Sequence, residues 1–178
     1  MLSGERVVLR PFRPDDVEPL WRAKLDPAMW AQTTEAPLTP VTLEEHRARY
    51  SEPSTGDAAQ FAVDVDGRLV GRAAVFNVDN LARHAEIGLS LLPEHQGRGY
   101  GRDVLRVLVG YGFRSRNLRR IHLQTLAGNV AALRAYAAVG FVEEGRLREH
   151  AWVEGAYDDV VLMGLLRRDW AQTSSPSR

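Results

Sequence analysis

The sequence predicts an α/β domain in which one mixed sheet carries helices on both faces. Apolar residues alternate with the period of a strand in several short segments, and they recur with the period of a helix in others. The predicted order of elements is β-α-α-β-β-β-α-β-α-β-β. No internal repeat, low-complexity tract or linker interrupts this order. Because strands and helices are interleaved along one chain of domain size, a single sheet between helical layers is the expected packing.

The first strand and helix are predicted from an apolar run followed by two aspartates. Residues 7–11 have strand character and end at a proline. Asp15 and Asp16 favour the start of a helix that runs to about residue 25, because acidic side chains accept hydrogen bonds from free N–H groups there and oppose the helix dipole. Residues 26–41 contain three prolines, so we expect an irregular connection.

A second helix is predicted from its first turn. Thr42 and Glu45 have the spacing of a capping box, in which each side chain bonds the backbone N–H of the other residue. We expect this helix to end near Tyr50 and to be followed by a loop over residues 51–58.

Two glycine-containing pairs predict β-hairpins. Asp66-Gly67 and Glu154-Gly155 each stand between apolar runs, and glycine tolerates the positive φ that a tight turn requires. The strands that these turns join are predicted at 60–65 with 68–76, and at 141–153 with 157–165.

The middle of the chain alternates between strands and helices. Strands are predicted at 84–92 and at 121–125 from their alternating or short apolar runs. Helical periodicity covers residues 99–116 and 129–139, and Gly140 is placed to cap the second of these helices in a left-handed conformation.

Composition excludes several classes of protein. The 178 residues carry 23 basic and 23 acidic side chains, for a formal net charge of zero, and no cysteine. Zero net charge provides no global field toward nucleic acid or an anionic membrane. The absence of cysteine excludes disulfides, thiolate metal sites and a cysteine nucleophile. No two of the five histidines have the spacing of helical metal ligands, so no metal is expected.

One domain is expected over residues 1–170, with a disordered polar tail over 171–178. The start of the sequence lacks the basic-then-apolar layout of a signal peptide. The longest apolar run, from Val160 to Leu166, is too short to span a bilayer. These features predict a cytoplasmic protein.

The strongest functional signal is the stretch Gln-Gly-Arg-Gly-Tyr-Gly at 96–101, between a predicted strand and a predicted helix. Glycines allow the backbone to approach a ligand closely, and the first N–H groups of a helix favour an anion. Seven arginines and one acid, Asp103, stand between residues 98 and 120. This pattern predicts a pyrophosphate site, and a tight turn without a ligand is the alternative.

The residues exclude two common phosphate-binding motifs. The P-loop spacing with its Lys-Ser/Thr ending is absent. The dinucleotide pattern needs a third glycine where Arg102 stands, and Arg119 and Arg120 occupy the region where its acid is expected.

The same stretch resembles the Gln/Arg-x-x-Gly-x-Gly/Ala motif of the GNAT superfamily, the acyl-CoA-dependent N-acyltransferases. A second motif of this family, Asn-x-x-Ala-x-x-x-Tyr-x-x-x-Gly-Phe, is matched from Asn129 to Phe141. A third similar stretch is Gly-x-Tyr-x-Asp at 155–159. Together the first two motifs are specific for the family.

The resemblance covers about residues 5–170 and extends to one branch of the family. Glu-Ile-Gly at 86–88 and Pro-Glu at 93–94 look like the branch of ribosomal-protein N-terminal and polyamine acetyltransferases. Membership implies the GNAT fold, with a mixed, mostly antiparallel central sheet and helices on both faces.

The resemblance also implies acetyl-CoA as cosubstrate and a path along which it binds. The amides from Arg98 to Arg102 would bind the pyrophosphate. The backbone near Leu89 to Leu91 would pair with the pantetheine arm at a bulge in that strand. Asn129 would bond the pantetheine, and a plain helix N-cap is its alternative role. The predicted cofactor-binding residues are Leu89, Leu91, Gln96, Gly97, Arg98, Gly99, Tyr100, Gly101, Arg102 and Asn129.

Glu86 and Tyr136 are the predicted catalytic residues. The resemblance implies that Tyr136 protonates the departing thiolate, and seven residues, nearly two helical turns, place it on the same face as Asn129. The incoming ammonium must lose a proton, and Glu86, whose pKa burial is expected to raise, is the candidate base. Packing for Tyr136 and a solvated or salt-bridged glutamate for Glu86 are the alternatives. Ser90, on the same side of the strand as Glu86, could hold a water.

The predicted activity is transfer of acetyl from acetyl-CoA by direct attack of a primary amine, on a protein N-terminus or a small molecule, by a monomer or homodimer. Trp30, Glu35 and Trp152 stand in segments where the family builds acceptor sites. Two alternatives are a non-catalytic acyl-CoA-binding module of the same fold and a nucleotide-binding α/β protein.

Overall fold

Eight strands form one sheet in the order β1-β2-β3-β4-β5-β6-β8-β7 in the computed structural model, which describes residues 1–33, 39–51 and 57–173. The strands are β1 (Leu2–Ser3), β2 (Val8–Arg10), β3 (Ala59–Val65), β4 (Arg68–Asp79), β5 (His84–Leu91), β6 (Arg120–Leu126), β7 (Val142–Val153) and β8 (Ala156–Leu166). The helices are α1 (Val17–Lys24), α2 (Pro27–Thr33), α3 (Leu43–Ser51), α4 (Tyr100–Gly110), α5 (Val130–Ala137) and α6 (Arg167–Thr173). Shorter turns are η1 (Pro14–Asp16), η2 (Pro93–His95) and the π-helical η3 (Tyr111–Ser115).

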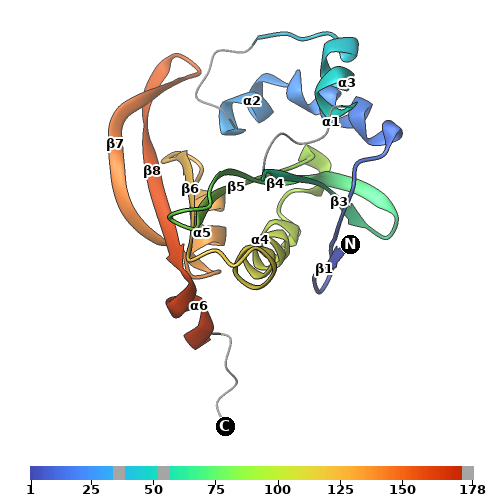
Figure 1. Ribbon diagram of the computed structural model, residues 1–178. Coiled ribbons are helices and arrows are strands. Elements are labelled where there is room, and N and C mark those ends of the chain that lie inside the picture. The colour runs from blue at the N-terminus through green and yellow to red at the C-terminus, as the bar shows by residue number, and fades with distance from the viewer. Residues whose placement is uncertain (34–38, 52–56, 174–178) are drawn as a thin grey trace.

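Helices cover both faces of this sheet (Figure 1). The first three, α1 to α3, lie over one face, whereas α4 packs on β4 and β5 from the other face with α5 beside it. Within the described strands, β5 with β6 is the one parallel pair, and the other neighbours are antiparallel. The predicted fold class is therefore confirmed.

The main core lies between the sheet and α4. Val104, Leu105 and Leu108 of α4 belong to one buried cluster with Ile87 of β5 and Ile121 of β6. Burial of each of these side chains contributes about 1.5–3 kcal/mol. The core holds the first turn of α4 next to the carboxyl end of β5, so the glycine-rich loop between them has a fixed position.

Both predicted hairpins are confirmed. Asp66-Gly67 joins β3 to β4 with φ angles of 51° and 80°, and Glu154-Gly155 joins β7 to β8 with φ angles of 47° and 88°. A two-residue turn with positive φ at both positions matches the twist of the strands that it joins.

A buried ion-pair network fixes the start of α1 against the sheet. Arg10 of β2 donates hydrogen bonds of 2.6 and 2.9 Å to Asp16 and one of 2.8 Å to Asp64 of β3. Burial opposes ionisation of Asp16, but hydrogen bonds from Arg10 and from the backbone of Arg13 outweigh it and lower the pKa of that carboxyl. The helical layer over β2 and β3 is thus anchored by charges that neutralise one another.

Three segments differ from the sequence prediction. Residues 27–33 form α2 within the predicted irregular connection, because Pro27 occupies the first turn of the helix, where no N–H is needed. The helix predicted over 99–116 becomes π-helical at 111–115. Residues 171–173 complete α6 instead of starting a tail, and 174–178 lie outside the described residues.

Candidate active site

The predicted phosphate-binding loop connects η2, just after β5, to α4. Gly97 and Gly99 both have left-handed backbone angles, with φ of 71° and 84°. Within the part of the chain that the structure describes, no amide N–H of residues 97–102 donates a hydrogen bond. Consecutive open N–H groups at a helix start form a concave site for an anion. The geometry of the loop therefore fits a pyrophosphate.

The side chains of the loop have two roles: one stabilises the loop, and two others carry positive charge. Nε2 of Gln96 donates to the carbonyl of Leu91 at 3.2 Å, so this side chain braces the loop against the end of β5. Arg98 and Arg102 are exposed. Two exposed cationic side chains therefore stand beside the open amides, where they can approach a phosphate.

The strands β5 and β6 separate beyond the middle of β5. Three residue pairs join them, from His84 with Arg120 to Glu86 with His122. From there β6 continues along β8, so the edge of β5 over residues 87–91 has no partner strand on that side among the described residues. Leu89 and Leu91 lie on this edge. An open edge of this kind offers N–H and C=O groups to an extended ligand, as predicted for the pantetheine arm.

The bulge implied for this stretch of β5 is absent, and a bulge in β4 takes its place. The pairing of β5 with β4 is regular over residues 86–91. The register shifts in β4 around Asn77, which has a φ of 48°. This bulge places Asn77 so that Nδ2 donates to Oε2 of Glu86 at 2.9 Å. The irregularity therefore positions the candidate base.

Glu86 lines a pocket of about 270 Å³ where β5 and β6 begin to separate. Arg120 and Glu144 of the same pocket form an ion pair, whose hydrogen bond raises the pKa of Arg120 and lowers that of Glu144. This pair crosses β8 over Gly164, where a Cβ would collide with both side chains. Among the described residues Glu86 has no cationic partner, so it is the carboxylate available to a cation. The pocket is lined by Glu86, Arg120, His122, Leu123, Gln124, Glu144, Leu162 and Met163.

His122 is a functional candidate that the sequence analysis missed. It is the register partner of Glu86, and its ring lies edge to face with that of His84 at 5.4 Å. Burial lowers the pKa of His122, and the charge of Glu86 offsets this in part, so the imidazole is neutral at pH 7. The sequence alternation along β6 could have indicated this residue, because Arg120, His122 and Gln124 place polar side chains on one face of that strand.

Tyr136 lies on α5, on the opposite face of the sheet from Glu86. Its ring packs edge-on against Phe141 with centroids 6.1 Å apart. Burial raises the pKa of the Tyr136 hydroxyl to about 12, so the phenol stays protonated. Within the described chain the hydroxyl has no hydrogen-bond partner. Glu86 and Tyr136 are therefore separated by the sheet, and Tyr136 is not among the residues that line the pocket of Glu86.

Asn129 starts α5 as its N-cap. Its Oδ1 accepts the N–H of Ala132 at 3.1 Å, which is the capping role that the sequence left open. Asp158 of β8 accepts the N–H of Gly128 at 2.9 Å and so fixes the approach to this cap. The helix ends before Gly140, and Gly140 itself has a positive φ of 106°. A contact of Asn129 with pantetheine stays a prediction.

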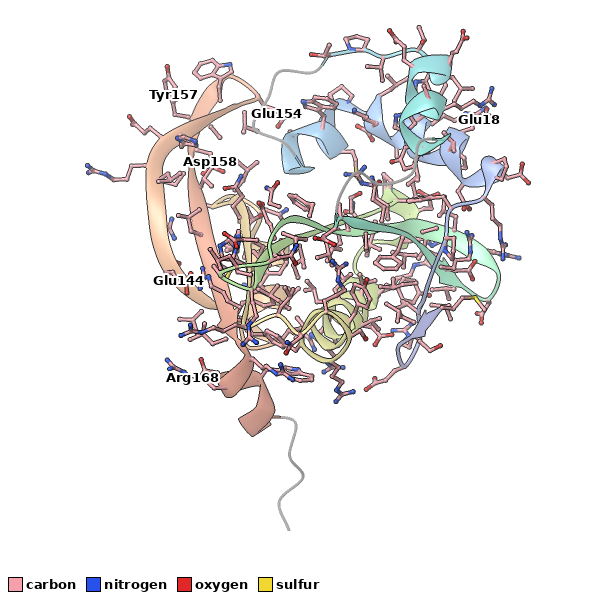
Figure 2. The ribbon with its side chains drawn as sticks, in the orientation of Figure 1. Glu18, Glu144, Glu154, Tyr157, Asp158 and Arg168 are labelled. Atoms are coloured by element: carbon pink, nitrogen blue, oxygen red, sulfur yellow. The ribbon has the colours of Figure 1, made fainter. Side chains whose placement is uncertain are left out.

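The aromatic residues predicted near an acceptor lie on two different elements. The ring centroid of Trp30 on α2 lies 5.2 Å from the ammonium nitrogen of Lys24. Trp152 packs against Tyr157 at 4.8 Å near the tip of the β7–β8 hairpin, where Figure 2 shows Tyr157 pointing away from the sheet. Glu35 lies outside the described residues. Their contribution to acceptor binding stays a prediction.

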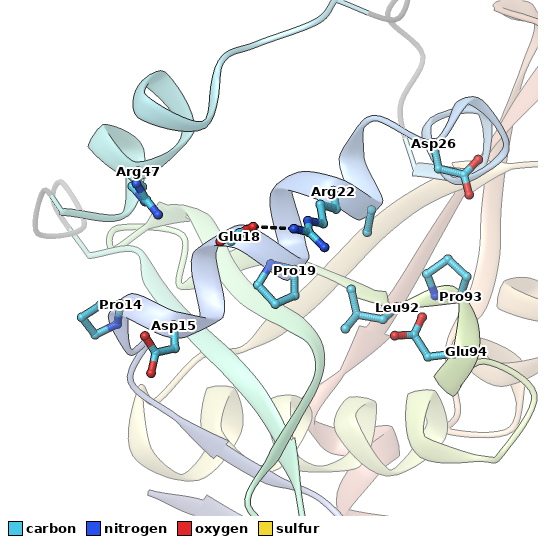
Figure 3. A pocket seen from close by; sticks show the side chains of 11 residues that line it. Pro14, Asp15, Glu18, Pro19, Arg22, Asp26, Arg47, Leu92, Pro93 and Glu94 are labelled. Atoms are coloured by element: carbon cyan, nitrogen blue, oxygen red, sulfur yellow. Dashed lines mark hydrogen bonds and ion pairs between the residues drawn. The ribbon is translucent and has the colours of Figure 1, made fainter.

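A larger cavity of about 560 Å³ lies apart from the candidate catalytic residues, between α1 and η2 (Figure 3). Glu18 and Arg22 form an ion pair of 2.7 Å along its wall. Neither Glu86, His122 nor Tyr136 lines it. Chemistry, and not size, therefore identifies the smaller pocket as the candidate active site.

The described residues form neither a metal site nor a membrane-spanning helix. Across residues 1–33, 39–51 and 57–173, no group of three His, Asp or Glu side chains is placed to hold a metal ion. No helix in these same ranges is both long enough and apolar enough to cross a membrane.

Comparison with known proteins identifies the family. A family model described as an acetyltransferase (GNAT) domain matches residues 6–142. The chain belongs to the GNAT acetyltransferases. This GNAT protein is therefore an N-acetyltransferase that uses acetyl-CoA, which confirms the family, the enzyme class and the cosubstrate predicted from its motifs.

Its relatives include both kinds of acetyltransferase suggested by the sequence. The spermidine N(1)-acetyltransferase of Vibrio cholerae is 33% identical over 111 residues, which are 62% of this chain and 64% of that enzyme. The putative ribosomal N-acetyltransferase YdaF of Bacillus subtilis is 29% identical over 176 residues, which cover 94% of each protein. A crystal structure of spermidine N-acetyltransferase from Vibrio cholerae with CoA and spermine matches with a TM-score of 0.86 at 25% identity. That match covers 94% of this chain and 99% of the other.

Proposed function

We propose that this GNAT enzyme acetylates a primary amine of a small cationic molecule, which attacks the thioester of acetyl-CoA directly. The observation that carries the proposal is the pocket at the separation of β5 and β6. There a carboxylate without a cationic partner, Glu86, stands at the end of an open strand edge. The relatives named for spermidine support a small amine as acceptor.

The loop and the open strand edge place the acetyl group. Amides of residues 97–102 bind the pyrophosphate, and the edge of β5 at Leu89 and Leu91 pairs with the pantetheine arm. An extended arm that follows this edge from the loop runs toward Glu86, because the loop lies at the carboxyl end of β5. The thioester then lies where the two strands separate.

Glu86 attracts the acceptor and prepares it for attack. An aliphatic amine is an ammonium ion at pH 7, since its pKa is near 10.4, and it must lose a proton to become a nucleophile. Glu86 takes this proton, directly or through a water. His122, neutral at the same pH and beside Glu86, is the second group able to accept it.

Tyr136 serves the leaving group from the other face of the sheet. As the amine nitrogen bonds to the carbonyl carbon, the bond from carbon to sulfur breaks and the sulfur leaves as a thiolate. The Tyr136 hydroxyl donates to that sulfur, and the proton removed from the amine balances the proton gained by CoA. No covalent enzyme intermediate is required, in agreement with the absence of cysteine.

The charges of the pocket favour a cation over an amino acid. Arg120, the cationic group of the pocket, is paired with Glu144 and so is not available to an acceptor carboxylate. A pocket of about 270 Å³ admits one end of a linear amine. A protein N-terminus is the second candidate acceptor, supported by the putative ribosomal relative.

An acceptor panel tests the proposal. Acetyl-CoA is incubated with the enzyme and spermidine, spermine, a short diamine, an aminoglycoside or a peptide with a free N-terminus, and released CoA is followed with a thiol reagent. We expect the highest kcat/KM with a linear polyamine. Turnover of peptides alone would favour the second candidate. Tight CoA binding without turnover of any amine would favour the non-catalytic module.

A further inference from the structure

The N-terminal segment is tied to the first turn of α4 by one carboxylate. Asp103 accepts the backbone N–H groups of Glu5, Arg6 and Val7 at 3.1, 2.7 and 3.0 Å. Asp103 is 5% exposed. Gly4 passes so close that a Cβ there would lie 2.6 Å from Oδ2 of Asp103. The one acid in the arginine-rich stretch therefore holds the backbone of Arg6 beside the phosphate-binding loop.

The side chain of Arg6 extends from its backbone, which Asp103 holds, to the carbonyl of Arg98 in the phosphate-binding loop. Its Nη1 donates to the carbonyl oxygen of Arg98 at 2.6 Å. Its guanidinium carbon lies 4.6 Å from the centroid of the Tyr100 ring. Nη1 also lies 3.4 Å from the position that a Cβ of Gly99 would occupy. The hydrogen bond to Arg98 and the contact with the Tyr100 ring hold the guanidinium in place although Arg6 is exposed.

The bond to Arg98 fixes the direction of the next amide. A peptide unit is planar and trans, so its C=O and N–H bonds point in opposite directions. The carbonyl of Arg98 and the N–H of Gly99 belong to one such unit. Because the carbonyl points to Arg6, the Gly99 N–H points away from Arg6. That N–H is one of the open amides of the loop, with no acceptor in the described chain.

We propose that Arg6 is a positioning residue for the CoA pyrophosphate: it holds the Arg98 carbonyl from behind the loop and so aims the Gly99 N–H at the phosphates. This inference rests on the pyrophosphate site of the proposed function. Preorganisation is the source of the effect, because an amide that already points at the anion need not be ordered when the anion binds. Asp103, which accepts the backbone N–H of Arg6, holds Arg6 beside the loop.

The test removes the guanidinium and measures binding without an acceptor. Arg6→Met keeps an apolar side chain over Tyr100 and lacks a donor. Isothermal titration should show that CoA and 3′-dephospho-CoA each bind about tenfold more weakly, equal to about 1.4 kcal/mol. Pantetheine, which lacks phosphates, should bind equally to both proteins in an NMR titration. Arg6→Lys, which keeps the charge and a donor, should recover most of the affinity.

Arg106→Met is the matched control. Arg106 is also exposed, on α4, and it pairs with Glu5 at 3.6 Å without a contact to the loop. Its loss removes the same charge and should change CoA affinity less than about twofold, because surface ion pairs contribute little. An equal loss in both variants would overturn the proposal in favour of a general charge effect.

Three other results would also overturn it. These are unchanged CoA affinity in Arg6→Met, an equal loss for pantetheine, and a loss for CoA that 3′-dephospho-CoA does not share. The last would assign Arg6 to the 3′-phosphate. The proposed function fails in a different way, since wild-type protein would then bind CoA and acetylate no amine, with the effect of Arg6 on binding intact.

Discussion

Replacement of Tyr136 by Phe removes one hydroxyl and keeps the ring that packs against Phe141. Because burial raises the pKa of this hydroxyl to about 12, it lies about 3.5 units above a thiol of ordinary pKa, near 8.5. Complete proton transfer to a thiolate would be uphill by about 5 kcal/mol at 1.36 kcal/mol per unit. The hydroxyl therefore stabilises the thiolate mainly as a hydrogen-bond donor. We expect kcat to fall by about 10²-fold, the low end for a positioned acid.

The assay compares initial rates of CoA release at saturating acetyl-CoA and amine. Affinity for CoA, measured by calorimetry, should be unchanged, because the hydroxyl acts on the leaving group. At pH 7 the free energy of unfolding should change by less than about 0.5 kcal/mol, since the hydroxyl has no partner in the described chain. Equal kcat in two folded proteins would refute the assignment and make Tyr136 a packing residue.

The same pair of proteins predicts an effect of pH on stability. The folded pKa of about 12 exceeds the unfolded value of 10.0, so the folded protein keeps a proton that the unfolded chain releases. Stability is therefore intact below pH 10 and falls as pH rises toward 12, by up to about 3 kcal/mol. At pH 11.5 the wild-type protein should have lost about 2 kcal/mol more stability than Tyr136→Phe. Urea unfolding at pH 7 and 11.5 measures the difference, and parallel losses in both proteins would contradict the burial argument.

Three further substitutions test the other parts of the site and fold. Glu86→Gln keeps the shape of the side chain but cannot accept a proton. Relative to wild type, its kcat should be lowest at low pH and should approach the wild-type value near the pKa of the amine. Parallel pH profiles of the two enzymes would remove Glu86 as base. Gly99→Val puts a β-branched residue at a φ of 84°, so CoA affinity should fall at least about tenfold by calorimetry, and an unchanged Kd would place the phosphates elsewhere. Arg10→Met leaves Asp16 and Asp64 buried without their cation, so the free energy of unfolding, measured by urea denaturation, should fall by about 3–5 kcal/mol. A loss under about 1 kcal/mol would contradict a stabilising role of this ion-pair network.

Features decided by neighbouring residues could be predicted from the sequence. The capping box is formed, with Thr42 Oγ1 accepting the Glu45 N–H at 3.2 Å and Glu45 Oε2 accepting the Thr42 N–H at 2.7 Å. Both hairpin turns and the glycine-rich loop depend on local backbone angles in the same way. Pro27 was misjudged because a proline excludes a helix interior but suits its first turn, and the sequence alone does not say which applies.

Features decided by long-range pairing could not be predicted. The opening at the active site exists because β6 leaves β5 after His122 and follows β8, a strand more than thirty residues further along the chain. Glu86 and His122 meet through the same parallel register. The bulge at Asn77 likewise depends on how β4 aligns with β5. No local pattern near any of these residues specifies its partner.

A crystal structure of the enzyme with CoA and its amine acceptor would show where both substrates bind. The proposed mechanism predicts the pyrophosphate on the amides of residues 97–102 and the pantetheine arm along the open edge of β5. It also predicts the sulfur within hydrogen-bond reach of the Tyr136 hydroxyl, at about 3–3.5 Å, and the amine nitrogen beside Glu86. An amine bound in the larger cavity between α1 and η2, or a CoA arm that does not enter between β5 and β6, would contradict it.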